Sequence, residues 1–275
     1  MQNGREEDEK MTVLGEQARA IGRYFDGRAD TYEEKMSRPY FRLLREITWQ
    51  HIRRFLPRQR GARVLDAGGA TGYWSMRLAR AGYRVVLVDV SEEMLAVAQA
   101  KINEAGLGGE IEVVLGDVTD LRDFSEGSFD ATLALEEPLS FCGDPEMAVA
   151  EMALVTKRDS IIAATVLNRF RSREHEKYLK KGDVEGLERY LRSGTTDGRE
   201  ISRKSFSAEE VEALFISNGL EVASAIGKPL FAEAAGGRLE DKAVFSKILE
   251  MELGHNANRS LWGTAETLEF VAIKA

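Results

Sequence analysis

The sequence predicts an α/β fold, with a mostly parallel sheet covered by helices on both faces. Its length of 275 residues can bury a sizeable core and favours one large, elaborated domain. From residue 61 onward, short apolar runs alternate with amphipathic segments, which is typical of βαβ units. A glycine-rich turn joins the first apolar run to the first amphipathic segment.

Residues 1–60 are predicted to form a helical extension. From about residue 13 to residue 56, apolar side chains recur at helical spacing between Arg and Glu residues. Pro39 suits a helix start, and Pro57 ends the next helix. The first ten residues are polar and acidic, without the basic start and apolar run of a secretory signal.

Residues 61–275 are predicted to form the α/β domain. Seven strands are expected, at residues 63–67, 85–89, 111–115, 129–135, 160–167, 222–226 and 268–273. Helices are expected at residues 73–81, 92–105, 145–156, 207–218 and 239–253. Ser207 and Glu210 form a capping-box pattern at the start of one of these helices. A charged segment at about 168–205 breaks the alternation and is predicted to be a helical insertion after the fifth strand.

Composition narrows the function further. The formal net charge of -8 disfavours nucleic acid as a partner. The single cysteine, Cys142, has no intrachain partner for a disulfide, and His51, His175 and His255 lack metal-ligand spacing. No run of about 18 apolar residues occurs, so no membrane span is predicted. We therefore expect a cytoplasmic protein that uses no metal.

Acidic residues follow successive predicted strands. The first strand leads into the turn from Asp66 to Gly72, where glycines allow a ligand to approach the backbone. Asp89 ends the second strand, where a carboxylate can accept hydrogen bonds from ribose hydroxyls, and Asp117 follows the third. Ala70 and Tyr73 occupy the second and third glycine positions of the dinucleotide pattern G-x-G-x-x-G, which disfavours a pyrophosphate site.

These segments, with Phe129 and Asp130 opening the fourth strand, resemble the class I S-adenosylmethionine-dependent methyltransferases, specifically small-molecule members of the type 11-like group. The resemblance is close over residues 63–167 and implies a Rossmann-like seven-stranded sheet with a final antiparallel strand at 268–274. Ala70 departs from it, because the commonest form of the motif has glycine there.

The resemblance also implies which residues contact S-adenosylmethionine. The implied contacts are Tyr24, Asp66, Ala67, Gly68, Gly69, Gly72, Asp89, Val90, Met94, Asp117, Val118, Leu135 and Glu136. For Met94, packing in the core is an equally good explanation. For Tyr24 and Tyr32 the alternative is aromatic packing along an amphipathic helix.

The acceptor-facing residues are expected after the fourth strand. Glu137 is the candidate general base there, and Tyr32 is placed near the same site by an N-terminal segment that resembles a lid over the cofactor. The adjacent carboxylates Glu136 and Glu137 tilt the prediction toward an amine acceptor, although one of them could simply face solvent. The candidates to line the acceptor pocket follow the fifth strand and are Asn168, Arg169, Phe170 and Arg173.

Two other functions stay open at this point. Transfer to an RNA or a protein would need a basic rim, for which the Arg and Lys residues between 169 and 181 are the support. A scaffold that binds the cofactor without catalysis is also compatible with the fold. Oligomeric state is open as well, with a homodimer among the options.

Overall fold

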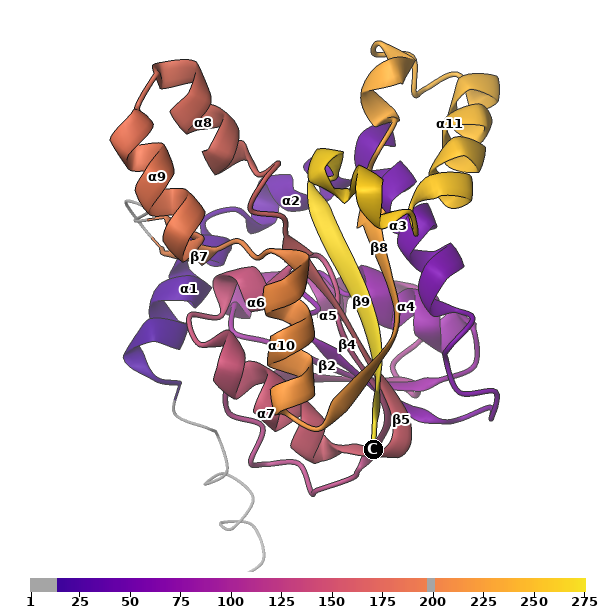
Figure 1. The fold of residues 1–275 in the computed structure, drawn as a ribbon. Coiled ribbons are helices and arrows are strands. Elements are labelled where there is room, and N and C mark those ends of the chain that lie inside the picture. The colour runs from indigo at the N-terminus through magenta and orange to yellow at the C-terminus, as the bar shows by residue number, and fades with distance from the viewer. Residues whose placement is uncertain (1–13, 197–200) are drawn as a thin grey trace, which may run out of the picture.

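A computed structural model describes residues 14–196 and 201–275, and the seven-stranded α/β architecture predicted from the sequence is confirmed (Figure 1). The strand order is β3-β2-β1-β4-β5-β9-β8. The strands are β1 (Arg63–Ala67), β2 (Arg84–Asp89), β3 (Ile111–Leu115), β4 (Phe129–Ala134), β5 (Thr156–Leu167), β8 (Leu220–Lys228) and β9 (Thr267–Lys274). The first five strands run parallel to one another, whereas β9 is antiparallel to both of its neighbours.

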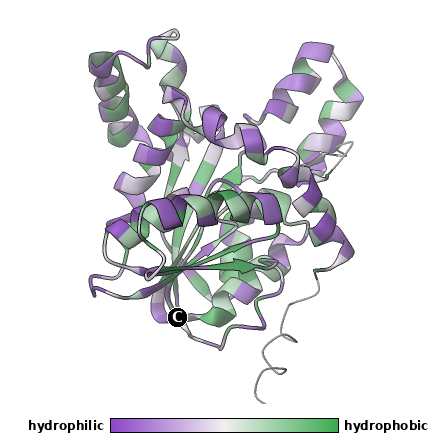
Figure 2. Ribbon diagram, turned by 180° about the vertical axis from the view of Figure 1, so that it is seen from behind, coloured by the Kyte–Doolittle hydropathy of each residue, from purple (hydrophilic) through white to green (hydrophobic). Residues whose placement is uncertain are grey.

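Helices cover both faces of this sheet (Figures 1 and 2). They are α1 (Glu16–Asp26), α2 (Ala29–Met36), α3 (Pro39–Ile52), α4 (Tyr73–Arg80), α5 (Glu92–Glu104), α6 (Pro138–Phe141), α7 (Pro145–Val155), α8 (Arg173–Lys181), α9 (Val184–Ser193), α10 (Ala208–Ser217) and α11 (Lys242–His255). Short 3-10 helices span Ala232–Ala235 and Arg259–Thr264, and β6 (Thr195–Thr196) pairs with β7 (Arg203–Lys204).

The sheet divides the apolar core into two layers because successive strand side chains point to opposite faces. Leu65 and Val86 pack with α7 and α10 on one face, whereas Val64 and Leu87 pack with α4 and α5 on the other. Figure 2 shows this pattern as apolar strands between helices whose outer sides are polar. A rigid two-faced core of this kind holds the carboxyl ends of the parallel strands at fixed positions.

The N-terminal helices dock across those carboxyl ends. Asp26, the last residue of α1, accepts hydrogen bonds from Ser91 Oγ (2.6 Å) and Glu93 N (3.2 Å) at the start of α5. Glu33 of α2 accepts from Lys101 Nζ (2.8 Å) on α5 and from Thr71 Oγ1 (2.5 Å) in the glycine turn. These contacts bring the N-terminal helices against the turn and the strand ends.

Several element boundaries differ from the prediction. The helical pattern expected from residue 13 to 56 is divided into three helices by breaks at Gly27 and before Pro39; its first residue lies outside the described ranges, as do the acidic first ten residues. β5 starts at Thr156, directly after α7, rather than at residue 160. α11 starts at Lys242 rather than residue 239, because the Asp241 carboxylate caps it by accepting from Ala243 N (2.8 Å). The capping box of Ser207 and Glu210 is present as predicted.

No helix within residues 14–196 and 201–275 is both long and apolar enough to cross a membrane. Over the same described ranges, His, Cys, Asp and Glu side chains form no group of three or more that could hold a metal ion.

Candidate functional site

Two adjoining cavities lie at the carboxyl ends of the parallel strands. The smaller, of about 80 Å3, borders the glycine turn and is called here the turn cavity; the larger, of about 490 Å3, is enclosed mainly by α2, α3 and the ends of β4 and β5 and is called the large cavity. Four side chains line both of them: Phe25, Tyr32, Glu136 and Phe141. The two cavities therefore meet at one point, beside Glu136.

The glycine turn shapes one wall of the turn cavity. Gly68 has a φ of 80°, and a Cβ built on it would lie 2.7 Å from Pro138 Cγ, so a side chain there would collide with the start of α6. A Cβ on Gly69 would lie 2.8 Å from Asp66 Oδ2 and from the Leu87 side chain. Gly68 thus keeps the cavity wall bare, whereas Gly69 permits close packing beneath the turn.

Besides Glu136, two acids line the turn cavity, Asp89 and Asp117. Asp89 Oδ2 accepts a hydrogen bond from Ala70 N (2.8 Å) and Oδ1 accepts from Ser91 N (3.0 Å), so the carboxylate is held by backbone donors. Burial raises the pKa of Asp89 and is only partly offset by these donors. Asp117 is held similarly, since its Oδ1 accepts from Thr119 N (2.9 Å). Each carboxylate is oriented before any ligand arrives.

The residues expected to contact the cofactor separate into two groups. Those that line the turn cavity are Gly68, Asp89, Val90, Met94, Asp117, Val118 and Glu136, while Tyr24 lines the large cavity. Neither cavity is lined by Asp66, Ala67, Gly69, Gly72 or Leu135. Their contact with the cofactor therefore stays a prediction.

Particular contacts explain the second group. Asp66 is buried and accepts a hydrogen bond from Ser75 Oγ (2.5 Å) of α4, and burial raises its pKa to about 7. Leu135 packs in the core layer beneath α4, and a Cβ on Gly72 would meet Leu87 and Ala98 within 3.3 Å. Asp66 ties the turn to α4, and Gly72 lets α5 approach it.

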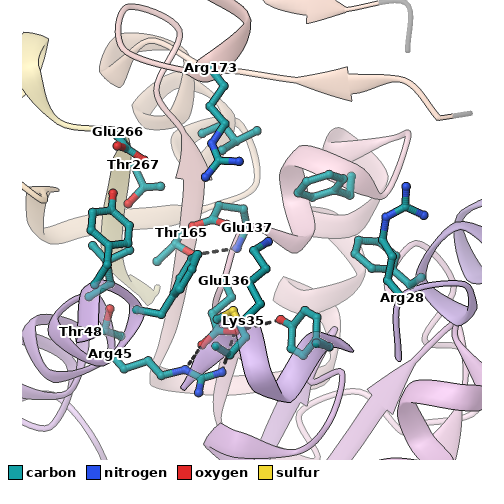
Figure 3. A pocket seen from close by; sticks show the side chains of 18 of the residues that line it. Arg28, Lys35, Arg45, Thr48, Glu136, Glu137, Thr165, Arg173, Glu266 and Thr267 are labelled. Carbon is teal, nitrogen blue, oxygen red and sulfur yellow. Dashed lines mark hydrogen bonds and ion pairs between the residues drawn. The ribbon is translucent and has the colours of Figure 1, made fainter. Parts of the chain in front are cut away.

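The two adjacent glutamates lie in a strained turn. Glu136 and Glu137 both have left-handed backbones, with φ of 64° and 69°, an unfavourable conformation for non-glycine residues that often occurs at functional sites. Pro138 then begins α6. The Glu136 carboxylate accepts hydrogen bonds from Nε (2.6 Å) and Nη2 (3.2 Å) of Arg45. It accepts a third from the Tyr32 hydroxyl (3.1 Å) (Figure 3). Glu136 is therefore already neutralised by α3.

Glu137 has a different environment. Its backbone N donates to Thr165 Oγ1 (2.9 Å), and its side chain lines the large cavity (Figure 3). Within the described part of the chain, its carboxylate accepts no hydrogen bond and makes no ion pair. Burial, followed by the nearby Glu136 charge, raises the pKa of Glu137 to about 7. A carboxylate of this kind is suited to exchanging a proton near neutral pH.

The two tyrosines contact opposite parts of the site. Burial and the adjacent Glu136 hold the pKa of Tyr32 well above its usual value, so its hydroxyl stays a donor. Tyr24 Oη accepts from Arg203 Nη2 (2.7 Å), and Arg28 lies 3.5 Å from the centre of its ring. Tyr32 sits where the cavities meet, and Tyr24 closes one side of the large cavity.

Sequence reasoning missed the cationic residues that α2, α3 and β8 contribute to the large cavity. Lys35, Arg45 and Lys228 all line it. A signal for Arg45 was present, because Arg45, Thr48 and Ile52 share the buried side of α3 at helical spacing. No comparable pattern marked Lys35 or Lys228, since their positions depend on how separate elements meet.

Comparison with known proteins agrees with this architecture. Residues 64–159 match the family model described as a methyltransferase domain. This segment is a methyltransferase domain of the class I S-adenosylmethionine-dependent type. The matched methyltransferase segment includes the glycine turn, Asp89, Asp117 and both glutamates, and ends within β5.

The matches with curated relatives cover only part of each relative's length. A phosphatidylethanolamine N-methyltransferase of Cereibacter sphaeroides is 36% identical over 111 residues, covering 40% of this chain and 52% of the relative. A malonyl-[acyl-carrier protein] O-methyltransferase of Erwinia billingiae is 30% identical over 141 residues, covering 50% of this chain and 49% of the relative. The chain spans between about a third and a half of the first such methyltransferases.

Solved structures agree over nearly the whole chain. The geranyl diphosphate C-methyltransferase of Streptomyces coelicolor superposes with a TM-score of 0.65, at 14% identity, covering 96% of this chain and 100% of that one. At this identity the likeness concerns the fold alone, and it extends well beyond residues 64–159.

Proposed function

We propose that this chain transfers a methyl group from S-adenosylmethionine to a small-molecule acceptor held in the large cavity. The observation that supports this most directly is the meeting of two cavities of different chemistry. One is bordered by the bare Gly68 backbone, Asp89 and Asp117, and the other presents Glu137. A donor molecule in the first and an acceptor in the second would meet beside Glu136, which lines both.

The walls of the turn cavity fit an adenosyl ligand in their chemistry. Asp89 can accept from ribose hydroxyls, Asp117 can accept from an exocyclic amine, and Met94 offers apolar contact. The volume of about 80 Å3 is below the usual range of about 300–1,000 Å3 for ligand pockets. Phe25 and Phe141 pack edge to face across it, with ring centroids 5.6 Å apart. In this proposal α1 acts as a lid, and moving Phe25 with it admits the nucleoside.

In the proposed mechanism the bound cofactor supplies an activated, electrophilic methyl group. Glu137 accepts the proton that the acceptor's nucleophilic atom loses when it takes the methyl group, while the sulfur–methyl bond breaks and leaves its electron pair on sulfur. Glu137 later releases the proton to solvent. Tyr32 and Arg45 hold Glu136 in place at the junction, so Tyr32 has a positioning role rather than that of a proton acceptor. The N-terminal helices exclude water from the junction.

A cavity of about 490 Å3 favours a small acceptor over RNA or protein. Two residues of the basic run that could have formed a rim are engaged in internal ion pairs: Arg169 with Glu210 (2.5 Å), and Arg171 with Glu233 (2.5 Å). The argument for an amine acceptor also loses one of its two carboxylates, because Arg45 neutralises Glu136. In a non-catalytic scaffold, the unpaired carboxylate of Glu137 in the cavity would have no function.

Asp89→Asn tests the cofactor site. We expect it to weaken the binding of S-adenosylhomocysteine by roughly tenfold to a hundredfold, because a charge-assisted hydrogen bond to ribose is lost while the size of the side chain is kept. Calorimetry gives the affinity, and Glu112→Gln, an exposed carboxylate on the neighbouring strand β3, is the matched control. Equal affinities of Asp89→Asn and wild type would contradict the assignment.

A further inference from the structure

The lining of the large cavity carries more positive than negative charge. Among the described residues that line it, six are cationic and three are acidic. Arg45 is paired with Glu136, and Lys228 is paired with Glu269 behind the wall. Of the other four cations, Arg28 and Arg203 interact with Tyr24, while Lys35 and Arg173 share the lining with Glu137 and Glu266. This excess stands out in a chain with a formal net charge of -8.

Two of these cations converge without ion-pair partners. Figure 3 shows Lys35 of α2 and Arg173 of α8 reaching toward the level of Glu137 from opposite sides. In the described ranges neither side chain makes an ion pair or a hydrogen bond. Both line the same cavity, and the pKa of Lys35 is lowered by burial and then by the charge of Arg173, which the charges of Glu137 and Glu136 only partly offset. An anion between them would relieve the repulsion of the two charges.

Other features of the cavity describe the rest of the ligand. Trp74 Nε1 is buried and has no hydrogen-bond partner in the described structure, and Trp74 lines the cavity. A buried donor without a partner is costly, which favours a ligand oxygen that accepts from it. Met36, Phe41 and Leu44 supply an apolar wall, and about 490 Å3 suits a molecule of drug-like size.

We propose that the methyl acceptor is an amphipathic acid whose carboxylate or phosphate group binds between Lys35 and Arg173, while its apolar body packs on α3. This inference rests on the proposed function and specifies its substrate class. The start of α8 lies at the same wall, with its N-cap Ser172 lining the cavity, so the helix dipole adds to the positive potential. A protonated amine at this position would instead meet the two cations.

The test measures binding, so it does not depend on turnover. Three probes of one shape and different charge, namely benzoate, benzamide and benzylammonium, are compared by saturation-transfer NMR on the full chain with and without S-adenosylhomocysteine. We expect benzoate to bind most tightly. Lys35→Met/Arg173→Gln should weaken benzoate by about tenfold or more and leave benzamide nearly unchanged, because the substitutions remove charge and keep apolar volume.

The control Lys247→Met/Arg192→Gln removes the same charge from exposed sites on α11 and α9, away from the cavity. Benzoate affinity should be unchanged in it. Equal binding of the three probes, a preference for benzylammonium, absence of benzoate binding, or equal losses in both double variants would overturn the proposal. Calorimetry with S-adenosylhomocysteine on the wild type separates the outcomes: failure there contradicts the proposed function, whereas the benzoate comparison tests the two cations.

Discussion

Glu137→Gln is expected to lower kcat by about a hundredfold while changing the affinity for S-adenosylhomocysteine less than twofold. Glutamine keeps the shape of the side chain but does not accept a proton from the acceptor. Glu137 lines only the large cavity of the two, so the cofactor site should stay intact. Single-turnover measurements with an identified acceptor give the rate, and Glu112→Gln on β3 is the charge-matched control.

The pH dependence of the same variant distinguishes a proton acceptor from a structural residue. In the wild type, kcat/KM should rise with pH through about 7, because the pKa of Glu137 is raised to that value by burial and the basic form is the active one. The glutamine variant should lose this limb of the profile. A wild-type profile without a limb near 7, or a variant that retains it, would remove Glu137 from this role.

The stability of the folded protein should change in the direction opposite to its activity, both with pH and in Glu137→Gln. A carboxyl group whose folded pKa lies above its unfolded value binds its proton more tightly in the folded state, so its contribution to stability falls as the pH rises from about 4.5 to about 7. Above that range the folded protein retains an unfavourably placed carboxylate. Glu137→Gln removes this cost, and we expect its Tm at pH 8 to exceed that of the wild type. A less active but more stable variant would indicate that the site holds strain for function.

The sequence predicted the elements of the sheet well because each strand and its following helix carry their own periodic pattern. β1 and β3 were predicted with their observed bounds, and the capping box at Ser207 fixed the start of α10. Leu135, which the resemblance assigns to the cofactor, alternates with Leu133 and Ala131 and packs with them in one core layer. Its contact with the cofactor stays a prediction.

The large cavity was beyond the reach of local patterns. Its charged wall combines Lys35 of α2, Arg45 of α3 and Lys228 of β8, which lie far apart in the sequence. Nothing in the spacing of these residues specifies that they meet. The neutralisation of Glu136 by Arg45 likewise depends on how α3 docks, so the inference that both glutamates are available to a substrate could be revised only from the structure.

Lys228→Met should destabilise the fold by about 3–5 kcal/mol, because it leaves the Glu269 carboxylate buried with one of its charge partners removed. Glu269 is fully buried, and it accepts from Thr48 Oγ1 (2.8 Å) and from His51 Nδ1 (2.7 Å) while pairing with Lys228. This network ties α3, and hence Arg45, to β8 and β9. Urea unfolding gives the loss, with Lys247→Met as the exposed control.

Burial alone would raise the pKa of Glu269, but the Lys228 charge and the hydrogen bond from His51 outweigh it and lower the pKa to about 2. A depressed pKa of this kind adds stability that is complete above about 4.5 and disappears as the pH falls toward 2. The difference between wild type and Lys228→Met should therefore shrink over that interval. Lys228→Met/Glu269→Leu, which removes both charges, should recover much of the loss, since an apolar pair of similar volume can replace a buried ion pair. A single variant as stable as the wild type at neutral pH would mean that the network does not hold α3 on the sheet, and the wall of the large cavity would then need another support.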